Sequence, residues 1–132
     1  MKAIEVISIP VTDQQKAKEF YLKLGFSMIA EAHFGNGEKW VQLGFPNEST
    51  TITLVNWWPF QETKMRAGSL HAVFVETDDL EKEMKELKAK GIEIGVLSTN
   101  GIEPGKIDDT ALGKFAHVID PDGNALVIHQ NK

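Results

Sequence analysis

The two halves of this sequence repeat one pattern: an acidic helix start, a helical stretch, and a glycine that ends it. Val11-Thr12-Asp13 with Leu24-Gly25-Phe26 in the first half corresponds to Thr77-Asp78-Asp79 with Lys90-Gly91-Ile92 in the second. Asp13 and Asp79 lie 66 positions apart, as do Gly25 and Gly91, and 66 is half of the 132 residues. We infer a tandem duplication. Because each copy alone is too small to enclose a site, we expect two paired modules to build one sheet or barrel, with the functional site where the copies meet.

The composition fits a single domain that does not bind nucleic acid. With 42% hydrophobic residues, a chain of 132 residues can bury a substantial core. Its 14 basic and 19 acidic side chains give a net charge of −5, and the basic residues form no cluster longer than Lys88-Ala89-Lys90. A nucleic-acid partner is therefore not expected.

The chain contains no cysteine, which excludes disulfides, thiolate metal sites and thiol nucleophiles. Residues 1–11 carry Lys2, Glu5 and Pro10 within a short apolar stretch, which is unlike a secretory signal. No apolar segment approaches the length of a membrane span. We therefore expect a cytoplasmic protein without membrane association.

Alternating apolar residues and helix caps predict a strand, a helix and three further strands in the first half. We expect a strand from Ile7 to Val11 and a helix that Thr12 or Asp13 caps and Gly25 ends. The three further strands are expected over 26–34, 39–45 and 51–55. In this interpretation, residues 1–132 form one domain, made of a first module (1–56), a linker (57–69) and a second module (70–132).

The second half repeats this order, with a strand over 70–76, a helix from Asp79 to Lys90 and a strand over 92–96. Residues 98–113, rich in Gly, Asp and Thr, are then expected to form a long loop, which suits either a binding loop or a disordered segment. The last hairpin, 114–119 and 125–129, turns at Asp120-Pro121-Asp122-Gly123-Asn124. Proline and glycine suit the backbone angles of a turn, so we assign this motif a structural role.

Three motifs together carry a family resemblance that covers nearly the whole chain. They are Phe20-Tyr21 before Leu24-Gly25-Phe26, Asp78-Asp79-Leu80 entering a helix that ends in Lys-Ala-Lys-Gly, and the closing Asp-Pro-Asp-Gly-Asn turn. In this order they resemble the vicinal oxygen chelate superfamily, which includes glyoxalase I, bleomycin-resistance proteins and extradiol dioxygenases. The resemblance implies an α+β fold of two tandem βαβββ modules that curl around a cavity. Since such folds serve many chemistries, function is left open.

Enzymes of this superfamily hold a divalent metal with His, Gln or Glu, one from the first and one from the last strand of each module. The resemblance places these four positions at Val6, Thr53, Ala72 and Val127. Valine and alanine side chains have no donor atom, and a threonine hydroxyl alone is a poor ligand. We therefore predict a protein without the usual metal centre and without a cofactor.

Histidines offer an alternative centre. His129 lies two residues after Val127 and so shares its strand face, and His117 lies in the facing strand of the hairpin. With Glu76, they could bind a ligand, transfer a proton or hold one divalent metal ion. His71 would join them only if the strand register were shifted by one residue, a question that the sequence leaves open.

Aromatic residues concentrate where the first module ends and the second begins: Phe34, Trp40, Trp57, Trp58, Phe60 and Phe74. Such side chains suit flat or cationic ligands, but they also build cores and dimer interfaces. Bleomycin-resistance proteins bind an aromatic drug in the comparable cavity, without chemistry and without metal ligands at these positions.

We therefore predict metal-independent binding of a small aromatic or hydrophobic molecule by a homodimer. The predicted ligand-binding residues are Trp40, Thr53, Trp57, Trp58, Phe74, Glu76, His117 and His129. One alternative is a glyoxalase-like lyase, isomerase or dioxygenase whose displaced metal ligands come from His71, Glu76, His117 and His129. Another is a non-catalytic dimerising domain.

Overall fold

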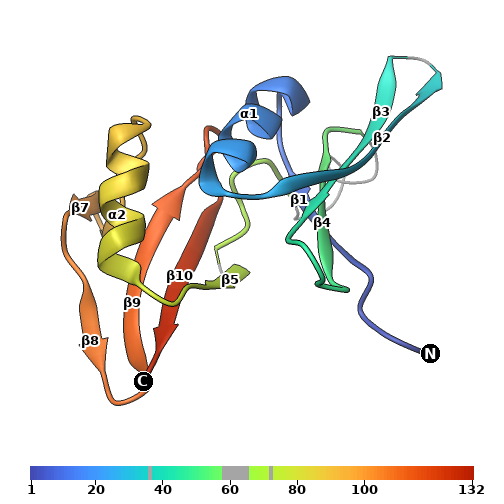
Figure 1. Cartoon of the computed structure of the whole chain (residues 1–132). Helices are drawn as coiled ribbons and strands as arrows, with labels where there is room; N and C mark the ends of the chain where they lie inside the picture. Colours follow the sequence, from blue (N-terminus) through green and yellow to red (C-terminus); the bar gives the residue numbers. More distant parts are fainter. Residues whose placement is uncertain (36, 58–65, 72) are drawn as a thin grey trace. The chain divides into compact units, whose positions relative to one another are not determined.

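The computed structural model describes residues 1–35, 37–57, 66–71 and 73–132 (Figure 1). The chain forms two compact units. The first unit comprises Met1–Leu70 with Asp120–Asn124, and the second comprises His71–Ile119 with Ala125–Lys132. Neither helix of the described part is long and apolar enough to cross a membrane. The turn at Asp120–Asn124 thus belongs to the first unit, although the strands on both sides of it belong to the second.

The first unit has the predicted βαβββ order. Its elements are β1 (Val6–Pro10), α1 (Gln14–Leu24), β2 (Ser27–Gly35), β3 (Glu38–Gly44) and β4 (Thr51–Val55). The strands form one sheet in the order β1-β4-β3-β2, in which β1 and β4 run parallel and the other pairs are antiparallel. All predicted elements are present, and most of their ends lie within one residue of those expected.

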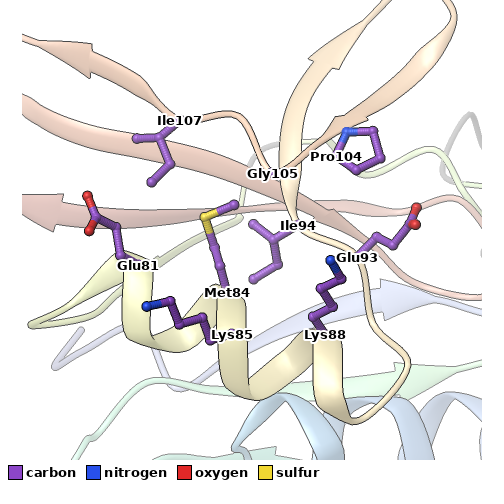
Figure 2. A pocket seen from close by; sticks show the side chains of 9 residues that line it. All are labelled: Glu81, Met84, Lys85, Lys88, Glu93, Ile94, Pro104, Gly105 and Ile107. Carbon is purple, nitrogen blue, oxygen red and sulfur yellow. The ribbon is translucent and has the colours of Figure 1, made fainter.

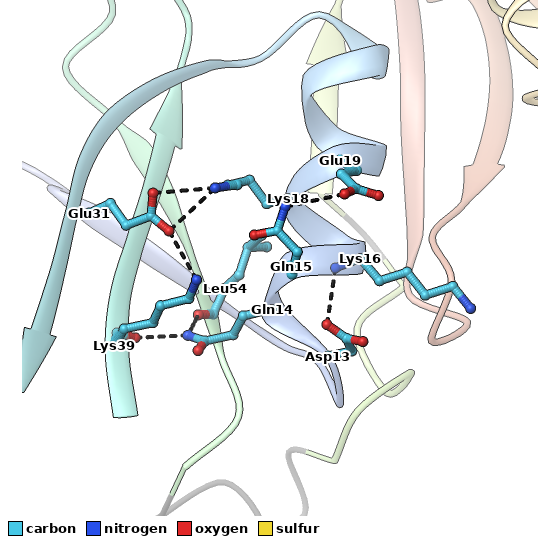
Figure 3. Close-up of polar contacts among 9 residues, drawn as sticks. All are labelled: Asp13, Gln14, Gln15, Lys16, Lys18, Glu19, Glu31, Lys39 and Leu54. Carbon is cyan, nitrogen blue, oxygen red and sulfur yellow. Dashed lines mark hydrogen bonds and ion pairs between the residues drawn. The ribbon is translucent and has the colours of Figure 1, made fainter. Parts of the chain in front are cut away.

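Local chemistry fixes both ends of α1. The Asp13 carboxylate accepts a 3.1 Å hydrogen bond from the Lys16 amide, which satisfies one of the unpaired N–H groups of the first turn (Figure 3). Gly25 ends the helix with φ of 114°, a left-handed conformation that glycine adopts without steric cost. Both predicted caps are confirmed.

Helix α1 covers one face of the first sheet. Its buried Ala17, Tyr21 and Leu24 lie against a core that includes Ile9 and Leu54, and these last two are 0% exposed. Polar contacts fix the helix in place as well.

The buried Gln14 side chain donates to the carbonyl oxygens of Lys39 and Leu54, both at 2.8 Å (Figure 3). Glu31 of β2 accepts from Lys18 of α1 and from Lys39 of β3. These contacts attach α1 to β2, β3 and β4, so α1 covers one face of this sheet and leaves the opposite face for other contacts.

The second unit repeats this plan and extends it. Its elements are β5 (Val73–Glu76), α2 (Leu80–Ala89), β6 (Gly95–Ser98), β7 (Gly101–Pro104), β8 (Asp108–Thr110), β9 (Gly113–Ile119) and β10 (Ala125–Asn131). The strand order is β5-β10-β9-β6-β7, with β8 paired to β9. The part β5-β10-β9-β6 matches β1-β4-β3-β2 of the first unit, so the tandem duplication is visible in the topology (Figure 1).

The prediction of a long loop over 98–113 was wrong, because this segment contains β7 and β8. Their sequences, Gly-Ile-Glu-Pro and Asp-Asp-Thr, have weak intrinsic strand preference. They are strands because their backbones pair with β6 and β9, a tertiary effect that local sequence does not report. The strand predicted over 92–96 also begins later, at Gly95, and the one predicted over 70–76 begins at Val73.

Strand register makes the equivalence of the two units explicit. Ser8 pairs with Thr53 in the first unit, and Phe74, 66 positions after Ser8, pairs with Val127 in the second. Thr53 and Val127 therefore occupy equivalent positions, as the sequence predicted. On the next strands, Gln42 pairs with Thr53 and His117 pairs with Val127.

Candidate functional site

In the second unit, the sheet face that α2 leaves open carries aromatic and histidine side chains. Leu126, Ile128, Ala116 and Val118 point to the α2 side and are buried. The alternate residues form two rows across β5, β10 and β9 on the other face. One row is Phe74, Val127 and His117, and the next is Glu76, His129 and Phe115. We call Phe74, Glu76, Phe115, His117 and His129 the imidazole face.

Rings on the imidazole face contact one another. The Phe115 and His129 rings stack with centroids 4.3 Å apart and an interplanar angle of 9°. Phe74 meets Phe115 edge to face at 6.1 Å and is 59% exposed. In the row of Phe74 and His117, Val127 is 5% exposed. The face therefore presents aromatic surface to solvent over an apolar floor.

Backbone hydrogen bonds fix the two imidazoles. The Leu97 amide donates to Nδ1 of His117 at 3.3 Å, so in the neutral ring the proton is on Nε2. Nε2 of His129 lies 3.0 Å from the Leu112 carbonyl oxygen, which can only accept, so this nitrogen also carries the proton. The Nε2–H donor of His129 is therefore occupied, whereas the Nε2–H of His117 has no hydrogen-bond partner within the described residues.

The structure thus brings together four of the predicted site residues: Phe74, Glu76, His117 and His129. Glu76 accepts a hydrogen bond from the Asn131 side chain, which orients its carboxylate. Phe115 was missed in the sequence. The signal was present, because Phe115 lies two residues before His117 and strand alternation assigns both to one face.

The first unit carries a second aromatic group, on the sheet face away from α1. Phe34 meets Trp40 at 6.4 Å and Trp57 at 5.5 Å, both edge to face, and Phe34 is 57% exposed. We call these three residues the indole face. Predicted site residues Trp40 and Trp57 thus come together, whereas Trp58 and Phe60 lie outside the described residues.

Polar side chains fill the rest of this face. Nε1 of Trp40 donates to Oε1 of Gln42 at 3.0 Å, and Nε2 of Gln42 donates to Oγ1 of Thr51 at 2.8 Å. Thr53 is 0% exposed and its hydroxyl lies 3.2 Å from that of Ser8. Hydrogen bonds therefore orient the Trp40 indole and the Gln42 amide.

The metal positions of the superfamily do not fit a metal ion here. Val6 and Val127 have no donor atoms, and the hydroxyl of Thr53 is paired with Ser8. The fourth position, Ala72, lies outside the described residues and its side chain also has no donor. Divalent ions need carboxylate, imidazole or several oxygen ligands, so this set cannot supply a coordination sphere.

Within the part of the chain that the structure describes, the displaced ligands of the alternative hypothesis are not assembled into a metal centre. Within the described residues, His, Asp and Glu side chains form no group of three that could hold a metal ion. His71 is exposed and precedes β5, where Phe74 and Glu76 occupy the imidazole face. The unshifted register therefore holds over Val73–Glu76.

The sequence matches the Glyoxalase/Bleomycin resistance protein/Dioxygenase superfamily over residues 3–128, and the chain belongs to this superfamily. Among individual relatives, it is 31% identical over 134 residues to the uncharacterized protein YwkD of Bacillus subtilis (strain 168), covering 98% of each chain. The predicted family and fold class are confirmed.

Comparison with solved structures supports the same family and fold. TnmS3, described as an antibiotic binding protein from Streptomyces sp. CB03234, superposes with a TM-score of 0.81 at 29% identity, covering 100% of this chain and 98% of that one. A glyoxalase/bleomycin resistance protein from Streptomyces sp. CB03234 gives a TM-score of 0.73 at 31% identity, covering 95% and 97%.

Proposed function

We propose that this protein binds a small, planar aromatic or hydrophobic molecule without a metal ion. The observation that carries the proposal is the exposed ring group of the imidazole face, in which Phe115 stacks on His129 and Phe74 lies edge-on. Exposed aromatic clusters over an apolar floor are typical of ligand sites, because the ligand covers surface that water hydrates poorly.

Two further observations support it. The side chains at the four superfamily metal positions lack suitable donor atoms. Residues at those positions therefore do not support a mechanism in which a metal ion polarises the substrate. A relative with 29% identity and a TM-score of 0.81 is described as an antibiotic binding protein. Binding rather than turnover is therefore the function that we assign.

The residues suggest how a ligand is held. Phe74 and Phe115 contact an aromatic ring, since edge and face contacts with aromatic partners are favourable. The Nε2–H of His117 donates a hydrogen bond to an oxygen on the ligand, because its Nδ1 is already engaged by Leu97. Glu76, fixed by Asn131, offers an acceptor at the edge of the face.

The test is isothermal titration calorimetry with bleomycin and with a panel of planar heteroaromatic compounds. We expect saturable binding of a panel member near one ligand per chain, weakened about tenfold by Phe74→Ala, because one aromatic contact and its buried area are lost. Phe34→Ala is the matched control, since Phe34 is similarly exposed but belongs to the first unit.

Binding that responds equally to Phe74→Ala and Phe34→Ala would contradict the assignment to the imidazole face. Failure of every compound to bind would contradict the proposed function itself. Circular dichroism of both variants checks that the fold is unchanged. We expect it to be unchanged, because substitutions at exposed positions usually have small effects on stability.

We also propose that the protein acts in the cytoplasm as a homodimer. Strand β2 is an edge of the first sheet and exposes Ile29 (51%) and Phe34 (57%), and unpaired edges with apolar side chains favour association. Light scattering checks the dimer, which should have twice the chain mass of 14.7 kDa. A monomer mass at high concentration would contradict it, and Ile29→Lys should dissociate the dimer.

A further inference from the structure

The second unit contains a cavity that none of the predicted site residues line. It has a volume of about 460 Å³ and lies between α2 and the chain over 93–107 (Figure 2). Gly95 pairs with His117 of the imidazole face, so the preceding residue, Ile94, points to the opposite side of the sheet. Because Ile94 lines the cavity, the cavity is separate from the imidazole face. Its volume is within the range of sites for small organic molecules.

The insertion specific to the second unit builds one wall of this cavity. Pro104, Gly105 and Ile107 line it, and they lie in the segment that adds β7 and β8. Among its described residues, the first unit has no strands that correspond to β7 and β8. This wall of the cavity therefore has no counterpart in the described part of the first unit.

Backbone contacts fix this wall. The Gly105 amide donates to the Ile94 carbonyl oxygen at 3.0 Å. At Gly95, an added Cβ would lie 1.9 Å from the Glu103 carbonyl oxygen, so only glycine allows β7 to approach β6 this closely. The cavity is thus shaped before any ligand arrives, which lowers the free-energy cost of binding.

The lining is apolar inside and cationic at the rim. Figure 2 shows the Met84 side chain extending from α2 between Ile94 and Ile107, and Ile94 is 3% exposed. Lys85 and Lys88 also line the cavity, are exposed, and have no ion-pair partner within the described residues. A thioether next to branched side chains adapts to flexible apolar chains.

The charges at the rim favour an anion. The carboxylate of Glu81 is paired with Lys114 at 3.2 Å, which neutralises it. The remaining charged groups of the lining are the ammonium groups of Lys85 and Lys88 and the carboxylate of Glu93. The rim therefore has two positive charges and one negative charge outside ion pairs among the described residues. The rim thus carries a local excess of one positive charge, although the net charge of the chain is −5.

We propose that this cavity is a second binding site, for an amphiphilic organic anion of the medium-chain carboxylate class. Its apolar body contacts Met84, Ile94 and Ile107, and its carboxylate is held by Lys85 and Lys88. The long ammonium side chains reach the head group while their stems cover the apolar body. This site does not depend on the function proposed for the imidazole face.

The test is NMR of protein labelled at the methionine methyl groups, titrated with decanoate below its micelle concentration. The chain has four methionines, and a Met84→Leu variant assigns the one resonance that lies in the cavity. We expect decanoate to shift the Met84 resonance saturably. Decylammonium, which has the same apolar chain and the opposite charge, is expected not to shift it.

The variant Lys85→Gln/Lys88→Gln should raise the dissociation constant for decanoate about fivefold, because two exposed ion pairs are lost. Lys2→Gln/Lys16→Gln is the matched control: it changes the net charge equally, but both lysines are exposed residues of the first unit and neither lines the cavity. It should leave the constant within about twofold.

An unshifted Met84 resonance at saturating decanoate overturns the proposal. An equal response to decylammonium, or an equal effect of the two double variants, overturns the role of the lysines and with it the ligand class. None of these results bears on aromatic binding at the imidazole face, which is measured separately with Phe74→Ala.

Discussion

The Tyr21 hydroxyl donates a 2.8 Å hydrogen bond to Oδ2 of Asp120, 99 residues later in the chain. Asp120 is 4% exposed, and its two oxygens also accept from the Asp122 and Asn124 amides and from the Asn124 side chain. The Asn124 side chain in turn donates to the Pro10 carbonyl oxygen. The Asp-Pro-Asp-Gly-Asn turn thereby ties α1 and the end of β1 together within the first unit, in agreement with its predicted structural role.

Replacement of Tyr21 by Phe should lower the free energy of unfolding by about 2 kcal/mol, because a buried carboxylate loses one of its donors. The ring contacts with Phe20 and Phe26 are kept, so the loss is that of the hydroxyl. Urea unfolding measures the change. Thr12→Ala is the control: it removes a hydrogen bond to Asp122 of the same turn at an exposed position, and should cost less than about 1 kcal/mol. Equal costs for both variants would contradict the role of burial.

Alkaline pH should destabilise the protein through the same residue. Burial, and then the charge of Asp120, raises the pKa of Tyr21 above its ordinary value of 10.0. The folded state therefore holds the proton more tightly than the unfolded state. This contribution to stability is complete below pH 10 and is lost as the pH rises above it.

Tyr21 is the single tyrosine of the chain, so tyrosinate absorbance reports on it alone. We expect no tyrosinate in the folded protein at about pH 11 and about nine-tenths of the full tyrosinate absorbance on unfolding by urea. The stability lost between about pH 8 and pH 11 should be larger in the natural chain than in Tyr21→Phe. Tyrosinate formation at pH 10 without unfolding would contradict the buried hydrogen bond.

Sequence predicted the fold where the determinants are local. The Asp13 and Asp79 caps, Gly25 with its φ of 114° and the strand Thr51–Val55 were all found where expected, because caps and short runs of strand-forming residues depend on neighbouring residues. Strands β7 and β8 were not predicted, because pairing with β6 and β9 makes them strands. For the same reason the cavity beside α2 could not be found: its wall depends on those strands.

The candidate site was predictable in part. Strand alternation placed Phe74, His117 and His129 on one face, and the observed registers agree. Strand alternation does not give the distances between side chains. The stacking of Phe115 on His129 and the hydrogen bond from the Leu97 amide to His117 were therefore not predicted. Ring packing and backbone contacts of this kind depend on the whole sheet.

Replacement of Gly95 by Ala should displace β7 and destabilise the protein by about 1 to 3 kcal/mol, as in overpacked cores. The physical reason is the 1.9 Å approach of an added Cβ to the Glu103 carbonyl oxygen. Amide chemical shifts and urea unfolding measure the effect. The largest shifts should lie in β6 and β7, while the Tyr21 to Asp120 hydrogen bond stays intact. A variant as stable as the natural chain would contradict the close approach.

Chelator-stripped protein should bind neither nickel, zinc, manganese nor iron(II) near one ion per chain. The superfamily positions Val6, Thr53 and Val127 provide a single hydroxyl, which is already paired with Ser8. Calorimetric titration checks this. Tight binding that is lost in His117→Ala or His129→Ala would contradict it and would redirect attention to glyoxalase and dioxygenase assays.

The two histidines of the imidazole face should respond differently to a bound aromatic ligand. In the neutral state both rings should carry the proton on Nε2, since Nδ1 of His117 accepts from Leu97 and Nε2 of His129 lies beside the Leu112 carbonyl oxygen. Nitrogen-15 correlation spectra of the imidazole rings report this directly, with the exposed His33 as the reference ring. On addition of a ligand that carries an oxygen acceptor, Nε2 of His117 should shift most, because its N–H is available to donate, while Nε2 of His129 keeps its bond to Leu112. A proton on Nδ1 of His117 in the free protein, or a larger Nε2 shift at His129 than at His117, would show that the donor of the imidazole face has been assigned to the wrong ring.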